Sequence, residues 1–131
     1  MELTILTPQR KVETNLQIEE LFAPGDKGML DILEGHAALV SGLETGFLRW
    51  RSGKNWSSAV ISRGFLEVKD NQIIVLADVL ERTDEIDITR AKKALETAQR
   101  KLAEGGLDDM NFKKFELKLK RAMSRINAAA N

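Results

Sequence analysis

Three arginine side chains occupy positions from which they could bind a phosphate-bearing ligand. Arg121 and Arg125 are four residues apart, a spacing that places both on one face of a helix. If the chain reverses at Gly105-Gly106, as in an antiparallel helical hairpin, Arg90 falls beside these two, at the level of about residue 122. Guanidinium groups so close together repel one another unless an anion lies between them, and their N–H donors match phosphate oxygens. An anionic ligand would remove this repulsion.

Two acidic residues near the start of this hairpin bear on the same question. Glu81 lies just before the first expected helix, and Asp87 lies at its expected N-terminus. Both could form ion pairs with the arginines or accept hydrogen bonds from the sugar or base of a nucleotide. In the simpler interpretation the arginines are solvated and Asp87 is a helix cap and an internal ion-pair partner. The residues alone leave both interpretations open.

The single histidine of the chain, His36, does not belong to a recognisable catalytic set. It lies in a glycine-containing turn near the polar Glu34, and the chain has no cysteine. A small β-sandwich hydrolase with His36 as general base would need a nucleophile and an orienting acid, and neither is evident. The same composition disfavours a metal site, and without a glycine-rich phosphate loop nucleotide hydrolysis is not expected. His36 is better interpreted as a turn residue at the surface.

The C-terminal segment carries an excess of positive charge. Over residues 110–131, six Lys and Arg residues are opposed by Glu116 alone, a net charge of about +5. This bias is compatible with the solvated face of an amphipathic helix, and it would equally attract an acidic partner. The basic residues are Lys113, Lys114, Lys118, Lys120, Arg121 and Arg125.

The spacing of apolar residues, which indicates the secondary structure that must position these side chains, changes near Glu81. Before this residue, short apolar runs alternate with turn residues about every ten positions, which is typical of a β-sandwich or barrel. Leu48 and Trp50 alternate with two arginines, as in a strand with one solvated face. A tight hairpin turn is expected at Asp70-Asn71, because asparagine tolerates a left-handed backbone.

Beyond Glu81 the apolar period is helical. Asp87 is the expected N-cap of a helix that ends at Gly105-Gly106, and Asp108 or Asp109 begins a second one. Each helix carries one apolar stripe, and in a hairpin the two stripes are expected to cover each other. The stripe residues are Ile88, Ala91, Leu95, Ala98 and Leu102, then Phe112, Phe115, Leu119, Met123 and Ile126. The expected fold class is α+β, with an antiparallel β-sandwich over residues 1–80 and an antiparallel two-helix hairpin over residues 81–131.

Composition narrows the function classes. The 131 residues include 20 Lys and Arg and 20 Asp and Glu, and this balance disfavours a nucleic-acid-binding protein, which needs a basic excess. The densest apolar run, residues 73–77, is too short to span a bilayer, and the N-terminus lacks the pattern of a signal peptide. We therefore expect a cytoplasmic protein that does not insert into a membrane.

Four motifs, in order along nearly the whole chain, resemble the epsilon subunit of bacterial F-type ATP synthases. The first is the Gly-His-Ala-x-Leu turn at residues 35–39, and the second is the hairpin of residues 63–68 and 73–78. The third is the Ile-Asp-x-x-Arg-Ala signature at residues 86–91, and the fourth is the helix end at residues 121–126. The chain departs from the family at Met29, Glu34, Ala38 and Arg63, where acidic, Pro, Pro and Gly residues are usual.

This resemblance implies a non-catalytic central-stalk subunit that couples proton transport to ATP synthesis. Its sandwich would contact the gamma subunit and the ring of c subunits, on the cytoplasmic face of the bacterial inner membrane and without inserting into it. Its helices would extend along gamma into the alpha/beta catalytic head and inhibit ATP hydrolysis. In some members the folded hairpin binds ATP, so the resemblance implies ATP as a regulatory ligand. It implies no required cofactor. A free-standing ATP-sensing module without a rotor partner is the alternative.

The resemblance also assigns roles to individual residues. The ATP-binding pattern of the family maps onto Glu81, Ile86, Asp87, Arg90, Arg121 and Arg125. The contacts with partner subunits map onto Met29, Glu34, His36, Lys114, Lys118, Arg121 and Arg125.

Overall fold

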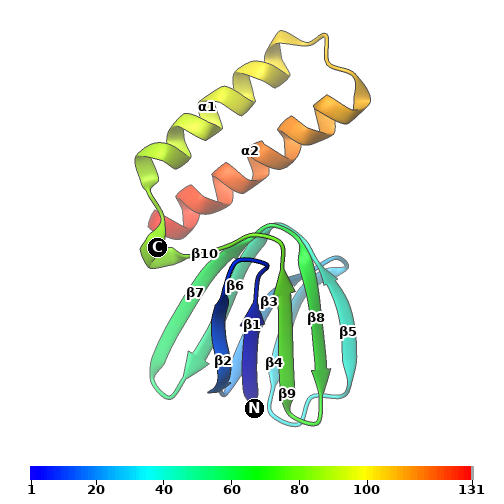
Figure 1. The fold of residues 1–131 in the computed structure, drawn as a ribbon, viewed down its shortest axis with the longest axis vertical. Coiled ribbons are helices and arrows are strands. Elements are labelled where there is room, and N and C mark those ends of the chain that lie inside the picture. Colours follow the sequence, from blue (N-terminus) through cyan, green and yellow to red (C-terminus); the bar gives the residue numbers. More distant parts are fainter. Residues whose placement is uncertain (131) are drawn as a thin grey trace.

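The computed structural model of the chain describes residues 1–130, with the side chains of residues 1–127. A helical hairpin lies across one end of a β-sandwich (Figure 1), so the expected order of a sandwich followed by a hairpin is confirmed. The strands are β1 Glu2–Leu6, β2 Lys11–Gln17, β3 Glu20–Gly25, β4 Gly28–Leu33, β5 Leu39–Leu43, β6 Gly46–Ser52, β7 Asn55–Ile61, β8 Gly64–Lys69, β9 Gln72–Ala77 and β10 Leu80–Arg82. The helices are the short 3-10 helix η1 Thr83–Glu85, then α1 Ile88–Glu104 and α2 Asp109–Ala130.

The strands form one sheet that curls into the two layers of the sandwich. Its order is β10-β7-β6-β3-β5-β8-β9-β1-β2, and β4 pairs with β3 beside this path. The pairing is antiparallel except between β1 and β9, which run parallel. At the edge of the sheet β10 pairs with β7, which places Leu80 opposite Ile61 and Glu81 opposite Val60. Because β10 continues past residue 80, Glu81 is held on the sheet.

One face of each central strand is buried in the core of the sandwich. On β6, Leu48 is fully buried and Trp50 is 1% exposed, while Arg49 between them is exposed, which confirms the expected alternation. Burial of this apolar surface is the main term that stabilises the sandwich. The largest buried side chains are Trp50, Leu3, Ile5, Leu21, Ile32, Leu48, Ile61, Leu66, Ile73, Val68 and Val75.

A tight turn and a glycine lie at the two ends of β8. Asp70 and Asn71 have φ angles of 51° and 57° and join β8 to β9, so the expected tight turn is confirmed. At the other end of β8, a Cβ on Gly64 would lie 2.1 Å from the carbonyl oxygen of Leu76. Glycine is therefore needed at this position, because β9 passes too close for a side chain.

Both long helices begin as expected, and α1 also ends as expected, whereas α2 continues past residues 121–126 to Ala130. The Asp87 carboxylate caps α1 by accepting a hydrogen bond from the Arg90 backbone N–H at 3.2 Å. The chain leaves α1 through Gly105 and Gly106, which have φ angles of 72° and 74°. Asp108 caps α2 by accepting from a backbone N–H at 2.8 Å. Neither helix, over the residues described, is long and apolar enough to cross a membrane.

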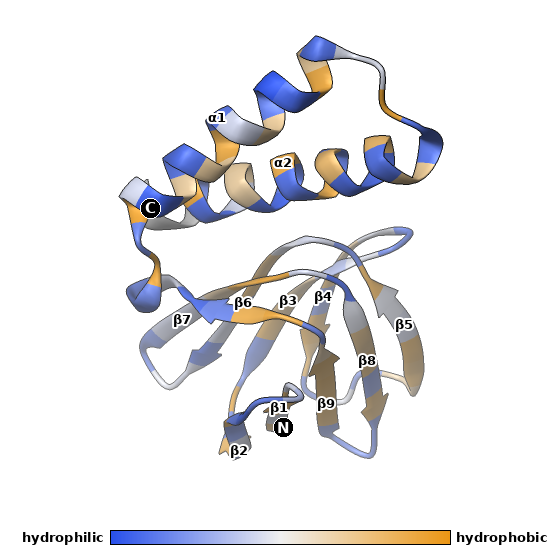
Figure 2. Cartoon of the chain, turned by 45° about the horizontal axis from the view of Figure 1, so that its top comes forward, coloured by the Kyte–Doolittle hydropathy of each residue, from blue (hydrophilic) through white to orange (hydrophobic). Residues whose placement is uncertain are grey.

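The helix–helix contact differs from the expected pair of stripes. Its buried residues are Ala91 and Ala98 on α1 and Ala122 on α2, whereas Phe112 is 45% and Met123 is 50% exposed. The prediction that the other helix covers Phe112 and Met123 was therefore wrong. Ala122 takes the place of Met123 in the contact, since the two positions are about 100° apart around the helix, whereas Phe115, Leu119 and Ile126 of the expected stripe are half-buried. Polar and apolar residues alternate along both helices (Figure 2).

The segment between the sandwich and α1 is tied to the sandwich. Arg10 donates two hydrogen bonds to the Glu85 carboxylate, at 3.1 and 2.7 Å. Arg82 Nη1 donates to Glu13 Oε1 at 2.8 Å. The hydroxyl groups of Ser58 and Thr83 lie 2.6 Å apart. Together these contacts, which we call the linker clamp, hold β10 and η1 on β2, β7 and the β1–β2 turn.

Candidate functional site

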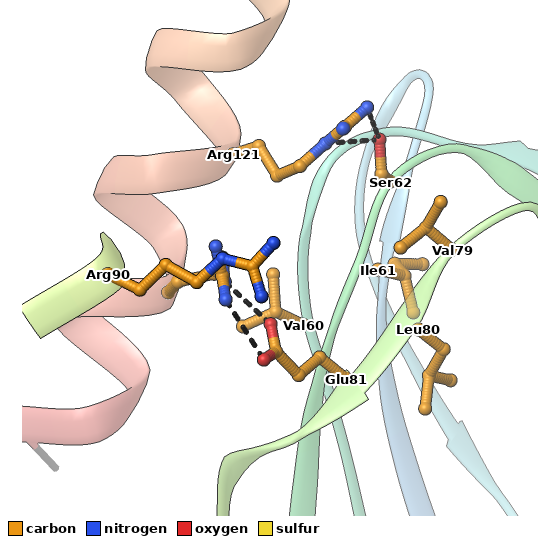
Figure 3. Close-up of a pocket in the computed structure, with 9 residues that line it drawn as sticks. Val60, Ile61, Ser62, Val79, Leu80, Glu81, Arg90 and Arg121 are labelled. Carbon is orange, nitrogen blue, oxygen red and sulfur yellow. Dashed lines mark hydrogen bonds and ion pairs between the residues drawn. The ribbon is translucent and has the colours of Figure 1, made fainter. Parts of the chain in front are cut away.

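A cavity of about 390 Å³ lies between the hairpin and the end of β7 (Figure 3). The sandwich supplies an apolar wall, with Val60 and Ile61 from β7 and Val79 and Leu80 from the segment that enters β10. The remaining lining residues are polar or charged: Ser62, Glu81, Arg90, Arg121 and Arg125. The three arginines that the hairpin register predicted to lie together thus line one cavity.

Arg125 is paired with an acid across the two parts of the molecule. Its Nε and Nη2 atoms donate to the two carboxylate oxygens of Glu81, at 2.6 and 3.0 Å. The side chains are 17% and 26% exposed, so this bidentate pair is partly shielded from water. Glu81 belongs to β10 and Arg125 to α2, so the pair joins the hairpin to the sandwich.

Arg121 is held by a neutral group. Its Nε and Nη2 atoms donate to the hydroxyl oxygen of Ser62, at 3.1 and 2.8 Å. Ser62 is 3% exposed and follows the last residue of β7. Sequence reasoning missed Ser62, because a serine at the end of an apolar run has no local signal for a contact 59 residues away.

The other predicted residues of the ATP pattern lie at the start of α1. Arg90 reaches the cavity from the first turn of α1. No side-chain partner of its guanidinium group is found within the described residues. Asp87 caps the helix, and the Ile86 backbone N–H donates to the Thr83 carbonyl oxygen at 3.4 Å. Asp87 and Ile86 are not lining residues of the cavity.

A second cavity, of about 330 Å³, lies between α1 and α2 and shares all three arginines with the first. Its other lining residues are Ala94, Thr97, Ala98, Phe115, Lys118 and Ala122. Across both cavities four cationic side chains face one carboxylate, an excess of three positive charges. Such an excess beside an apolar wall suits a ligand with several negative charges and an apolar part. No cluster of metal-ligating side chains occurs in the part of the chain that the structure describes.

Of the predicted interface residues, Arg121, Arg125 and Lys118 line the cavities, and the others lie in two further places. Met29 on β4 is 63% exposed, and Glu34 and His36 follow in the β4–β5 turn. His36 is half-buried, and its Nδ1 lies 2.7 Å from the Ala37 carbonyl oxygen. On α2 the Lys114 and Lys118 ammonium groups lie 5.9 and 5.2 Å from the ring of Phe115.

An exposed apolar patch on the outer face of β5, β8 and β9 was not anticipated. Val40 is 72% exposed, Phe65 63%, Leu76 48% and Ile74 40%. Phe65 lies opposite Leu76 in the β8–β9 register, and Glu67 lies opposite both Ile74 and Val40. We call these four apolar residues the β5–β8–β9 patch. An available signal was β9 itself, where residues 73–77 are apolar on both faces of the strand.

Comparisons with known proteins agree over both parts of the molecule. The family model for the beta-sandwich domain of the ATP synthase Delta/Epsilon chain matches residues 1–83, and the model for its long alpha-helix domain matches residues 84–130. The ATP synthase epsilon chain of Desulforamulus reducens is 42% identical over 127 residues, 97% of this chain and 95% of that one. The epsilon chain of a Cyanothece species is 37% identical over 131 residues, 98% of this chain and 94% of that one.

Two solved structures have the same fold. A chain of the mitochondrial ATP synthase of Euglena gracilis, solved with OSCP, F1 and the c-ring, has a TM-score of 0.87 at 24% identity and covers 100% of this chain and 81% of that one. A chain of the central stalk and c-ring of the Tetrahymena thermophila enzyme has a TM-score of 0.68 at 20% identity, with 98% and 96% covered. The resemblance found in the sequence motifs is confirmed. The chain belongs to the ATP synthase delta/epsilon family, whose epsilon chains are non-catalytic subunits of a multisubunit complex.

Proposed function

We propose that this chain is a rotor subunit of the ATP synthase central stalk that couples proton transport to ATP synthesis and restrains ATP hydrolysis through its helices. The observation that carries the regulatory part is the cavity between the hairpin and the sandwich. Glu81 and Ser62 come from the sandwich side, and Arg90, Arg121 and Arg125 come from the helices. A ligand in this cavity would bridge two parts that separate when the hairpin extends.

ATP is the proposed ligand. Its phosphates would bind the arginines, and its base would face the apolar wall formed by Val60, Ile61, Val79 and Leu80. ATP favours the docked hairpin only by binding it better than the extended form. At a concentration 100 times the dissociation constant, that preference amounts to about 2.7 kcal/mol. Binding would therefore relieve inhibition.

The proposed partners match the exposed surfaces. The β5–β8–β9 patch is the proposed contact with gamma, because four exposed apolar side chains on one sheet face are typical of a protein interface. Met29, Glu34 and His36 are the proposed contact with the c-ring. Lys114, Lys118, Arg121 and Arg125 of an extended α2 would face an acidic segment of the alpha/beta head, an attraction that salt weakens. These contacts would place the chain on the cytoplasmic face of the bacterial inner membrane.

The roles of the two parts can be separated by truncation. We propose that residues 1–80 form the contacts with gamma and the c-ring and that residues 81–131 contain the mobile regulatory part. The shortened chain should end after Glu85, because β10 and η1 are tied to the sandwich by the linker clamp. ATPase activity of a catalytic head that lacks this subunit is titrated with the full and the shortened chain. Both should bind gamma, and only the full chain should suppress hydrolysis; equal suppression by both would refute the regulatory role of the hairpin.

A free-standing ATP sensor is the second candidate, because every lining residue of the cavity comes from this one chain. It would bind ATP and form no stable complex with gamma. Copurification of the chain with gamma, tested with Phe65→Asp as the matched variant, distinguishes the two.

A further inference from the structure

The two arginines of α2 use the same edge of the guanidinium group to reach the sandwich. In both Arg121 and Arg125 the donors are Nε and Nη2. A guanidinium group has five N–H donors in a rigid plane, so this contact leaves the two Nη1 hydrogens and the outer Nη2 hydrogen. The outer Nη2 hydrogen and one Nη1 hydrogen form the adjacent, end-on edge, and the second Nη1 hydrogen points back along the side chain. Within the described residues no acceptor contacts that edge in Arg121.

The two anchors differ in charge. Glu81 neutralises Arg125 with a carboxylate, whereas the Ser62 hydroxyl fixes Arg121 and leaves its positive charge uncompensated. Arg121 therefore combines a fixed orientation, a full charge and a free bidentate edge, and it lines both cavities. A fixed guanidinium loses less side-chain entropy when it binds a phosphoryl group than a mobile one does.

We infer that Ser62 is a positioning residue of the ligand site: its hydroxyl holds the side edge of Arg121 so that the end-on edge is available to a phosphoryl group. A phosphoryl group would bind this edge without displacing Ser62. In the same way, the Glu81 carboxylate holds the side edge of Arg125. Because both of its oxygens already accept from Arg125, this role does not require Glu81 to contact the nucleotide. This inference rests on the proposed function, because it takes a phosphate-bearing ligand as the occupant.

The test measures affinity for ATP and for inorganic triphosphate by calorimetry, with the full chain. Ser62→Ala removes the hydroxyl. Ser57→Ala is the matched control, because Ser57 lies on β7, the strand that Ser62 follows, and it contacts neither Arg121 nor either of the two cavities. Without the Ser62 hydroxyl the ligand itself must immobilise the Arg121 side chain, and this cost predicts up to about tenfold weaker binding of both ligands to Ser62→Ala. Ser57→Ala should bind as the wild type does. In an Arg121→Ala background, Ser62→Ala should have no further effect.

Ser62 also helps to hold the hairpin on the sandwich, so a second experiment separates this docking role from the positioning of Arg121. Lys120 Nζ and Glu44 Oε2 lie 3.7 Å apart across the hairpin and the β5–β6 turn, and both side chains are more than half exposed. The chain contains no cysteine, so Glu44→Cys and Lys120→Cys can be joined by a short bismaleimide linker without side reactions. This linker keeps the hairpin docked in every variant.

In the linked protein, Ser62→Ala should still bind ATP and triphosphate more weakly than its linked parent, by up to about tenfold. Equal affinities there would overturn the inference and assign Ser62 to docking alone. If the wild-type chain, linked and unlinked, binds neither ATP nor triphosphate, the proposed ligand fails and the inference fails with it. If the wild type binds both and Ser62→Ala matches it, only the inference fails.

Discussion

Replacing Glu81 with alanine should release the hairpin from the sandwich more often. The substitution removes both hydrogen bonds to Arg125 and leaves that guanidinium group, 17% exposed, without an acid beside it. Exposed ion pairs contribute about 0–1 kcal/mol, and removal of one partner from a fully buried pair costs about 3–5 kcal/mol. This pair is partly shielded, so we expect a cost of about 2 kcal/mol. The docked population would fall roughly thirty-fold relative to the open one.

Amide hydrogen exchange of α2, followed by mass spectrometry, measures this opening directly, because local opening exposes the amides without unfolding the sandwich. Glu81 lies on β10, so its substitution leaves the sequence of α2 unchanged. Glu44→Ala is the matched control, because Glu44 also pairs with a basic residue of α2 but is 55% exposed. It should change the exchange rate of α2 less than about twofold. Equal effects of the two substitutions would show that the shielded Arg125–Glu81 pair holds the hairpin no more strongly than the exposed pair does, and would refute the reasoning.

Three further predictions concern the sandwich and the linker. The hydrogen bond from Arg10 lowers the pKa of the Glu85 carboxyl below its ordinary value of 4.5, so the pair stabilises the fold above that pH and loses this effect as the pH falls through the lowered pKa; denaturant titrations of wild type and Arg10→Ala should differ at pH 7 and converge in acid. Phe65→Asp should abolish copurification with gamma while leaving the thermal midpoint within a few degrees, about the effect of a surface change, because the side chain is 63% exposed. Gly64→Ala should destabilise the sandwich by more than about 2 kcal/mol in urea titrations, because the new Cβ would meet the Leu76 carbonyl oxygen at 2.1 Å; a loss below 0.5 kcal/mol, about the size of a surface effect, would contradict the close approach of β8 and β9.

Local sequence rules were sufficient for the parts of the fold that depend on local chemistry. The cap at Asp87 and the turn at Asp70-Asn71 follow from side-chain and backbone preferences within a few residues. Hairpin geometry also placed Arg90 near Arg121 and Arg125, because pairing about a turn needs only the position of the turn.

Contacts between distant strands and helices could not be predicted in this way. Ser62 and the apolar wall of the cavity come from β7 and the segment before β10, and only the tertiary fold brings them to α2. The use of Ala122 in place of Met123 depends on how closely the helices approach, which an apolar pattern does not specify. The exposure of Ile74 and Leu76 on β9 could not be predicted, because a run that is apolar on both faces does not indicate which face a partner covers.

The linker clamp sets the reach of the hairpin. Because Arg10, Glu13 and Ser58 hold residues 82–85 on the sandwich, any swing of the helices must turn about the short stretch at Ile86. At 1.5 Å per residue, α1 is about 26 Å long and α2 about 33 Å. If the turn at Gly105-Gly106 straightened, the tip of α2 would lie about 60 Å from that pivot. Removing the side-chain contacts of the clamp would free η1 and move the pivot back to the end of β10, which its pairing with β7 still holds on the sheet.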